Sequence, residues 1–155
     1  MKIFLILNES IGKRFLSSLN YDYIHLLGIC VDHKTDDFKF FLDHSKKNKY
    51  KLFNHKDIKN NKLKIWLSKN TLDLIINIFS YEIIPSNIIN IPQIGFFNLH
   101  PGKLPEYSGL NPVSWSIHNG ETKHYVTLHW ITKKIDGGPI VYSDCFRIYK
   151  KDTGI

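Results

Sequence analysis

Short, continuous apolar runs are the feature that most constrains the fold of this chain. Four of them stand out in the sequence: Lys2–Leu7, Tyr23–Val31, Leu72–Phe79 and Gly95–Leu99. Runs of this length are typical of strands whose two faces are both covered in a parallel sheet. They predict a mostly parallel sheet at the centre of the protein.

The segments between these runs have helical spacing. Apolar residues recur three or four positions apart in Ser10–Leu19 and Ile58–Leu67, and a further amphipathic segment begins with Phe38–Leu42. Alternation of strands and helices is typical of an α/β domain, in which ligands bind beyond the carboxyl ends of the strands. We therefore expect chemistry just after Phe79 and just after Leu99.

The last third of the chain departs from this alternation. Two strand candidates follow, Tyr125–Ile131 and Ile140–Ile148. They are separated by Asp136–Pro139, whose Gly-Gly-Pro sequence strongly indicates a turn. The pair predicts an antiparallel addition to the sheet. A length of 155 residues suits a single domain. Because Asp152 or Thr153 would suit a helix N-cap and no helix follows, we expect one domain over residues 1–155 that is truncated or minimal at its C-terminus.

The charge and the cysteine content limit which partners and metals the chain is expected to bind. The formal net charge is +7, which favours anionic partners such as a nucleic acid, a phosphorylated metabolite or a polyglutamylated cofactor. A solvated surface explains the same excess, because much of it lies in the Lys- and Asn-rich stretch Lys46–Lys69. Cys30 and Cys145 form no CxxC pair, and the histidines show no metalloprotease spacing, so no metal is expected. Cys30 lies in an apolar run and is expected in the core.

The N-terminal run Met1–Leu7 is too short for a membrane span and lacks the cleavage site of a signal peptide. With so few cysteines, a reducing and therefore cytoplasmic setting is expected.

Three polar residues are candidates for catalysis. Asn98 and His100 are two positions apart, so their side chains point to the same side of a strand. The amide can donate to a developing oxyanion, and the imidazole can donate or accept a proton. Asp136 in its tight turn could be brought against His100, fix its tautomer and favour the imidazolium. On the residues alone, loop anchors and a routine turn aspartate are the commoner interpretations.

The segment after His100 has clear local signals. Residues 100–105 form a loop that is rich in Pro and Gly. Asn111 is predicted to cap a helix with Pro112 at its first position, and Gly120 is predicted to follow the end of that helix. Trp115 on this helix is expected to be a core anchor.

Two blocks of sequence resemble one family. Phe97–Gly109 (FNLHPGKLPEYSG) resembles the signature of the folate-dependent formyltransferases, in which Asn-x-His-Pro precedes a Leu-Pro and a Tyr-x-Gly. Val126–Trp130 and Ile135–Ile140 resemble the second signature, a Val-Thr strand and then an Asp before a Gly-rich turn. Order and spacing match over about residues 72–154, whereas the preceding part matches only in its pattern of elements. The chain is identified as a member of this family, most like the sugar N-formyltransferases.

The resemblance implies an α/β, Rossmann-like formyltransferase fold with 10-formyltetrahydrofolate as the formyl donor. It implies a catalytic trio of Asn98, His100 and Asp136, in which the first two serve the oxyanion and the third orients His100 and helps to move the amine proton. Acceptor contacts are expected from Lys103 and Tyr107. The folate is expected in a slot lined by these residues: Tyr81, Ile83, Ile84, Pro85, Ile131 and Ile135.

Two positions depart from the family pattern. Many members carry Ser where Gly102 stands and Arg where Ser108 stands. Neither belongs to the trio, so the departures concern the shape of the loop and its acceptor contacts.

Three branches of the family, which differ in the amine that they formylate, are candidates for this chain. The purine-pathway enzymes have a glycine-rich phosphate loop near the N-terminus, whereas Leu7–Gly12 has one Gly and an acidic residue. The initiator-tRNA enzymes add a basic C-terminal domain, for which 155 residues leave no room. The third branch formylates nucleotide-linked amino sugars, and its anionic diphosphate suits the lysine excess.

We therefore predict an N-formyltransferase that acts on a nucleotide-linked amino sugar, with no stable nucleic-acid partner, no membrane and room for a homodimer. The alternatives are a methionyl-tRNA formyltransferase-like enzyme with another amine acceptor, and a non-catalytic folate-binding module.

Overall fold

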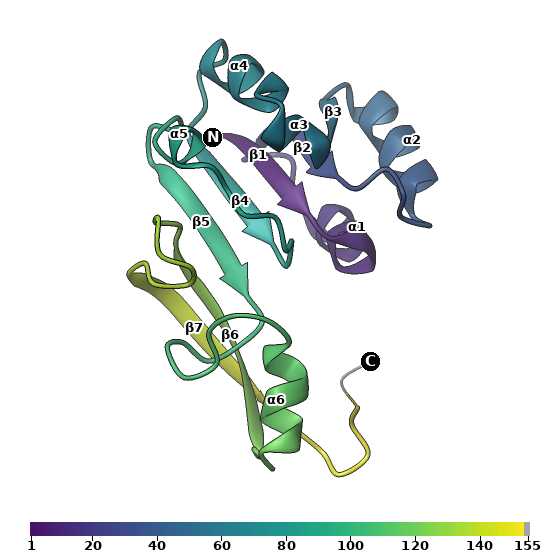
Figure 1. Ribbon diagram of the computed structural model, residues 1–155. Helices are drawn as coiled ribbons and strands as arrows, with labels where there is room; N and C mark the ends of the chain where they lie inside the picture. Colours follow the sequence, from purple (N-terminus) through teal and green to yellow (C-terminus); the bar gives the residue numbers. More distant parts are fainter. Residues whose placement is uncertain (154–155) are drawn as a thin grey trace. The chain divides into compact units, whose positions relative to one another are not determined.

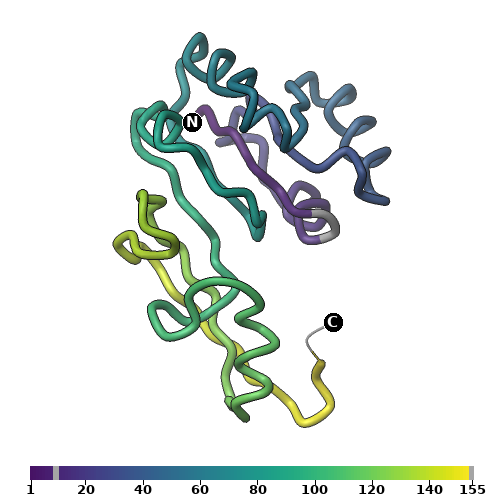
Figure 2. The backbone as a smooth tube through the Cα atoms, viewed as in Figure 1, coloured from purple at the N-terminus to yellow at the C-terminus, as the bar shows by residue number. Residues whose placement is uncertain are grey.

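The computed structural model describes residues 1–153, apart from the side chains of residues 9 and 10. The chain divides into two compact units, Met1–Phe96 and Phe97–Ile155. Figure 1 shows the elements of both units, and Figure 2 traces the backbone. The expectation of one catalytic domain over residues 1–155 stays a prediction.

The first unit contains a parallel sheet with the strand order β3-β2-β1-β4. Its strands are β1 (Lys2–Leu7), β2 (His25–Val31), β3 (Lys51–Asn54) and β4 (Leu74–Ile78). Its helices are α1 (Glu9–Ser18), α2 (Phe38–Asn48), α3 (Lys56–Lys59), α4 (Lys62–Ser68) and α5 (Ser86–Ile89). Every residue of β1 after Lys2 is buried, as the continuous apolar run predicts for a strand covered on both faces. Cys30 is buried in β2, which confirms its placement in the core.

One expectation for the first unit is wrong, and one strand was not predicted. The helical pattern over Ile58–Leu67 is divided between α3 and α4, because Asn61 adopts a left-handed conformation with φ 63° that an α-helix cannot contain. Asn tolerates this conformation better than most residues, since its short polar side chain can bond locally. The edge strand β3 was not expected, because its Phe53 lies within a stretch dominated by Lys and Asn.

The second unit contains the antiparallel strands β5, β6 and β7. β5 (Gly95–His100) begins at the end of the first unit, and β6 (Lys123–Trp130) pairs with both β5 and β7 (Ile140–Arg147). The predicted fold class, a mostly parallel sheet with helices and an antiparallel C-terminal addition, is confirmed. No helix among the described residues is long and apolar enough to cross a membrane.

Helix α6 (Pro112–His118) follows the loop after β5. Pro112 occupies the first turn and Gly120, with φ +69°, follows the helix, as predicted. Asn111 precedes the helix in a left-handed conformation, and its side chain makes no capping hydrogen bond. The core role expected for Trp115 is wrong, because its side chain is 55% exposed. The helix buries Pro112 and Ser116, four residues apart, and Trp115 lies off that stripe.

Candidate active site

β5 carries Asn98 and His100 at its carboxyl end, at the same side of the strand because they are two residues apart. His100 is buried, with only 4% of its surface exposed, and Asn98 is half-buried. β6 runs antiparallel beside them, with His129 opposite Asn98 and Thr127 opposite His100.

The turn between β6 and β7 brings Asp136 to these two residues. Its Oδ1 lies 3.4 Å from the Asn98 Nδ2, and its Oδ2 lies 3.6 Å from the His100 Nδ1. The turn depends on Gly138, because a Cβ at that position would collide with the carbonyl group of Trp130. The structure thus gathers Asn98, His100 and Asp136, called here the polar trio.

The carboxylate of Asp136 is held in its ionised form. The backbone N–H of Gly109 donates a hydrogen bond of 2.8 Å to its Oδ2. Burial alone would raise the pKa of Asp136, but a hydrogen bond from the protonated form of His129, the N–H of Gly109 and the charge of His100 outweigh burial and lower it. The carboxylate therefore stays an acceptor at neutral pH.

The other ring nitrogen of His100 is also engaged. Its Nε2 lies 2.7 Å from the carbonyl oxygen of Tyr107. Because a carbonyl oxygen only accepts, Nε2 carries a proton and donates it, and Nδ1 is left to face Asp136. The ring orientation is thus set from both sides. Donation from Nε2 to a substrate would require this contact with Tyr107 to open.

His129 is a fourth polar residue in the cluster, for which the sequence predicted no role. Its Nδ1 donates to the carbonyl of Trp130 at 2.9 Å, so that in the neutral ring Nε2 accepts from the Asn98 amide at 3.1 Å. The same Nε2 lies 3.5 Å from the Asp136 Oδ1. His129 lies directly opposite Asn98 in the pairing of β5 with β6, and knowledge of that pairing would have identified it from the sequence.

Comparison with known proteins places this chain in a family. A family model described as Formyl transferase matches residues 26–154. The chain belongs to the formyl transferase family. In sequence it is similar to the bifunctional polymyxin resistance protein ArnA of Wigglesworthia glossinidia brevipalpis, with 37% identity over 92% of this chain and 22% of that protein. It is 39% identical to the methionyl-tRNA formyltransferase of Azobacteroides pseudotrichonymphae over 49% of this chain and 24% of that protein. The chain thus spans only a minor part of the length of these relatives.

Solved structures share the fold of this family member. The glycinamide ribonucleotide transformylase 1 of Geobacillus kaustophilus matches 99% of this chain and 86% of its own, with a TM-score of 0.80 and 15% identity. The phosphoribosylglycinamide formyltransferase of Streptococcus pneumoniae TIGR4 matches the same shares, with a TM-score of 0.78 and 19% identity. At such identities the likeness concerns the fold, and it confirms the predicted Rossmann-like formyltransferase fold.

The family's formyl donor is 10-formyltetrahydrofolate. The residues predicted to bind it after β4 lie on an anchored loop of the first unit, where the Asn77 amide donates to the Ser80 carbonyl and Glu82 pairs with Lys59 at 3.4 Å. Tyr81 and Ile83 on this loop are 71% and 75% exposed. Exposed apolar side chains on a held backbone fit an aromatic, hydrogen-bonding ligand such as a pterin. The remaining predicted residues lie as follows: Ile84 and Pro85 half-buried on the same loop, and Ile131 half-buried and Ile135 exposed after β6 in the second unit.

The departure of this family member at Gly102 has a steric basis. A Cβ there would lie 2.7 Å from the Pro112 Cβ and 3.0 Å from the His100 Nε2. The buried hydroxyl of Thr127 donates to the Gly102 carbonyl at 2.7 Å. The loop that follows His100 is therefore pinned against β6 and α6 where only glycine fits. Ser108, the second departure, is exposed.

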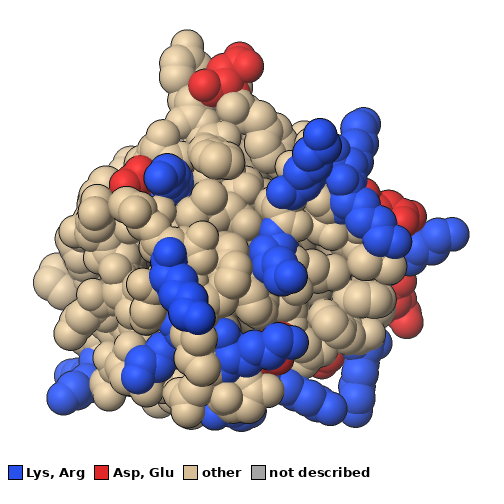
Figure 3. Space-filling view, turned by 90° about the horizontal axis from the view of Figure 1, so that it is seen from above, with Lys and Arg blue, Asp and Glu red and all other residues tan. Residues whose placement is uncertain are grey.

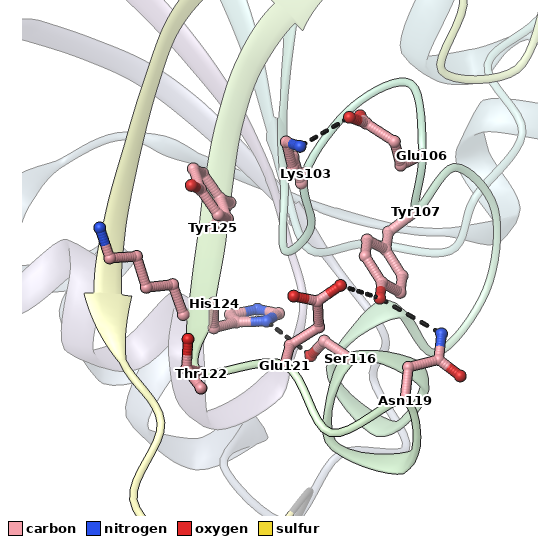
Figure 4. Close-up of a pocket in the computed structure, with 10 residues that line it drawn as sticks. Lys103, Glu106, Tyr107, Ser116, Asn119, Glu121, Thr122, His124 and Tyr125 are labelled. Atoms are coloured by element: carbon pink, nitrogen blue, oxygen red, sulfur yellow. Dashed lines mark hydrogen bonds and ion pairs between the residues drawn. The ribbon is translucent and has the colours of Figure 1, made fainter.

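Lys103 and Tyr107, predicted to contact the acceptor, point away from the polar trio. The ammonium of Lys103 pairs with Glu106 at 2.7 Å, and the hydroxyl of Tyr107 donates to Glu121 at 2.7 Å. Both side chains line a separate hollow of the second unit (Figure 4). The structure therefore brings the trio together but does not add these two side chains to it.

Proposed function

We propose that this chain transfers a formyl group from 10-formyltetrahydrofolate to the amino group of a nucleotide-linked amino sugar. The observation that carries the proposal is the convergence of Asn98, His100 and Asp136, with contacts of 3.4 and 3.6 Å, in a member of the formyl transferase family.

When bound, the folate supplies the formyl carbon that the acceptor amine attacks. The Asn98 amide then releases one of its contacts with His129 and Asp136 and donates that N–H to the formyl oxygen as negative charge develops there. The ionised Asp136 orients His100, whose imidazole can support the same oxygen once its Nε2 leaves the Tyr107 carbonyl, and Asp136 accepts the proton that leaves the amine. One C–N bond forms as another breaks, and the proton lost by the acceptor balances the proton gained by the departing nitrogen.

Several observations support an amino-sugar acceptor. The turn from β1 to α1 does not resemble a glycine-rich phosphate cradle, because Gly12 lies within α1 and packs against Leu7, where a Cβ would lie 2.8 Å from the Leu7 Cβ. Lysine and arginine side chains are spread over the face seen in Figure 3, with fewer acidic ones among them, which suits an anionic diphosphate. The similarity to the polymyxin resistance protein extends over 92% of this chain.

A second candidate is formylation of a charged initiator tRNA. Similarity to two proteins named methionyl-tRNA formyltransferase favours it, at 39% identity over 76 residues and 29% over 106 residues. A non-catalytic folate-binding module is disfavoured, because all members of the polar trio are present. The proposal includes a cytoplasmic location and no stable nucleic-acid partner, and leaves room for a homodimer.

The test incubates the protein with 10-formyltetrahydrofolate and a panel of nucleotide-linked amino sugars, with methionyl-charged and uncharged initiator tRNA in parallel. Mass spectrometry should detect one added formyl group on an amino sugar. Formylation of the charged tRNA alone would overturn the acceptor proposal and leave formyl transfer standing. No formylation of any amine, together with intact folate binding, would support the non-catalytic module instead.

A further inference from the structure

The loop that follows β4 leaves the strand through a strained residue. Phe79 adopts a left-handed conformation with φ 54°, which residues other than glycine rarely adopt. Such a conformation persists only where the surrounding contacts hold it, and it is frequent at ligand-binding segments. The residues after Phe79 therefore need anchors, and they form the loop that is predicted to receive the formyl donor.

Exposure alternates along this loop. The side chains of Tyr81 and Ile83 are exposed, whereas those of Glu82 and Ile84 are half-buried. Successive side chains of an extended segment point to opposite sides, so Glu82 faces the protein while its two neighbours face outward. A contact made by Glu82 therefore fixes the direction in which Tyr81 and Ile83 are presented.

Both carboxylate oxygens of Glu82 face a side chain that can carry positive charge. Oε1 lies 3.7 Å from the Nδ1 of His55, and Oε2 lies 3.4 Å from the Nζ of Lys59. These partners follow β3, whereas Glu82 follows β4, and β2 and β1 lie between those two strands in the sheet. The carboxylate thus ties the loop after β4 to the far edge of the parallel sheet in the first unit.

The partners of Glu82 are themselves held. The backbone N–H of His55 donates to the Val31 carbonyl at the end of β2, at 3.2 Å. The carboxylate of Asp57 accepts a backbone N–H from the last residue of β3 at 3.0 Å, which fixes the start of α3, the helix that carries Lys59. The histidine and the lysine are therefore a fixed support, and Glu82 passes that order on to the loop.

The contacts of Glu82 should matter more for the shape of the loop than for the stability of the fold. The side chain of Lys59 is 73% exposed, and those of His55 and Glu82 are 15% and 22% exposed. Ion pairs with an exposed partner contribute little to the free energy of unfolding, because water screens them. Ordering a loop before its ligand arrives, by contrast, directly reduces the cost of binding.

We propose that Glu82 is a positioning residue for the formyl donor. Paired with His55 and Lys59, it holds the loop after β4 in the conformation that receives the pterin. Tyr81 and Ile83 then meet the donor with their exposed apolar faces. This role rests on the proposed function, because the donor must bind at this loop. Since Glu82 faces away from the donor, its loss should weaken donor binding and leave the chemistry intact.

The first experiment measures binding of 5-formyltetrahydrofolate, a stable reduced folate, to the full chain by calorimetry. Glu82→Gln keeps the size of the side chain but removes its charge, and it should raise the Kd about fivefold, as expected for loss of a partly buried ion pair that orders a loop. Lys62→Gln is the matched control, because this exposed lysine pairs with Asp57 and not with the loop, and it should leave the Kd unchanged. An unchanged Kd in Glu82→Gln would overturn the positioning role, whereas no binding to the wild-type protein would overturn the donor site itself.

Further variants test whether the two partners act through Glu82. Lys59→Gln, at an exposed side chain, should raise the Kd about twofold, and His55→Gln should raise it by a similar factor. Adding either change to Glu82→Gln should cost no further affinity, because the carboxylate that both partners contact is already neutral. Additive losses would show that the lysine and the histidine act on the donor without Glu82, and would overturn the assigned role.

Steady-state kinetics with an accepted amine separate positioning from general stability. In Glu82→Gln the KM for 10-formyltetrahydrofolate should rise about fivefold, while kcat and the KM for the acceptor stay unchanged. The melting temperature should stay within about 2 °C of the wild-type value. A clear drop in melting temperature, with equal changes in both KM values, would assign Glu82 a structural role only and overturn the proposal.

Discussion

The two units of this chain differ in what their interiors are made of. Within the described residues, the completely buried apolar side chains lie in the first unit, in strands such as β1 and helices such as α2 and α4. The side chains that the second unit buries are mostly polar: His100, Ser116, His124, Thr127 and His129. Burying a polar group is costly unless it is hydrogen-bonded. The interior of the second unit therefore depends on a hydrogen-bond network, which also fixes the orientations of its side chains. The comparison teaches that the site is stabilised by the same bonds that aim its side chains.

The largest expected effect on stability lies in the first unit. Phe4 is completely buried in β1 against Phe53 and Trp66. Phe4→Ala should lower the free energy of unfolding by about 3–5 kcal/mol, because it removes apolar burial and leaves a cavity. Urea unfolding measures this. The exposed Tyr142 of β7 is the control in the second unit, and Tyr142→Ala should cost under about 1 kcal/mol. Equal losses would contradict the stabilising role assigned to the buried Phe4.

In the second unit the largest effect should be on activity. Asn98→Ala removes a proposed oxyanion donor and should lower turnover about 100-fold or more. Its effect on unfolding should be well below that of Phe4→Ala, since Asn98 is only half-buried. Turnover is measured with saturating donor and acceptor. Near-normal turnover would remove Asn98 from the proposed mechanism.

A smaller loss is expected when one buried bond of the network is removed. Thr127→Val keeps the shape of the side chain but leaves the Gly102 carbonyl without the 2.7 Å bond from the hydroxyl, at a cost of about 1–3 kcal/mol. Turnover should fall as well, because the loop after His100 loosens. Thr127→Ser keeps the hydroxyl and should restore both quantities. Thr122→Val, at an exposed position, should change neither.

The smallest effect should be a dependence of stability on pH. Burial lowers the pKa of His124, as does the charge of His100, while the Pro101 carbonyl acts in the opposite sense. A histidine whose pKa is lowered on folding contributes stability that is present above its unfolded pKa of about 6.5 and is lost as the pH falls from that value through the lowered pKa of the folded state. His124→Gln should flatten the fall in melting temperature between about pH 7 and pH 5.5. An unchanged slope would show that other groups cause it.

Much of the fold could be predicted from the sequence, because the first unit is built from continuous apolar runs. The pattern predicted β1, β4 and β5 within two residues of their bounds. It missed β3, where a single buried Phe53 stands among lysines and asparagines. It also missed the break at Asn61, because helical spacing persists across a residue that leaves the helix.

The candidate site was predictable only in part. A strand period of two placed Asn98 and His100 together, and resemblance to a family added Asp136. His129 was missed because its neighbourhood depends on how two strands pair, which spacing does not reveal. The bond from His100 to Tyr107 was missed because its acceptor is a backbone carbonyl, which every residue possesses.

Gly138 has a consequence for genetics. It carries no functional group, yet any side chain there would collide with the Trp130 carbonyl and displace the turn that presents Asp136. In a random mutagenesis screen, position 138 should therefore yield proteins that accumulate normally but have lost their activity, as if a reacting group had been deleted.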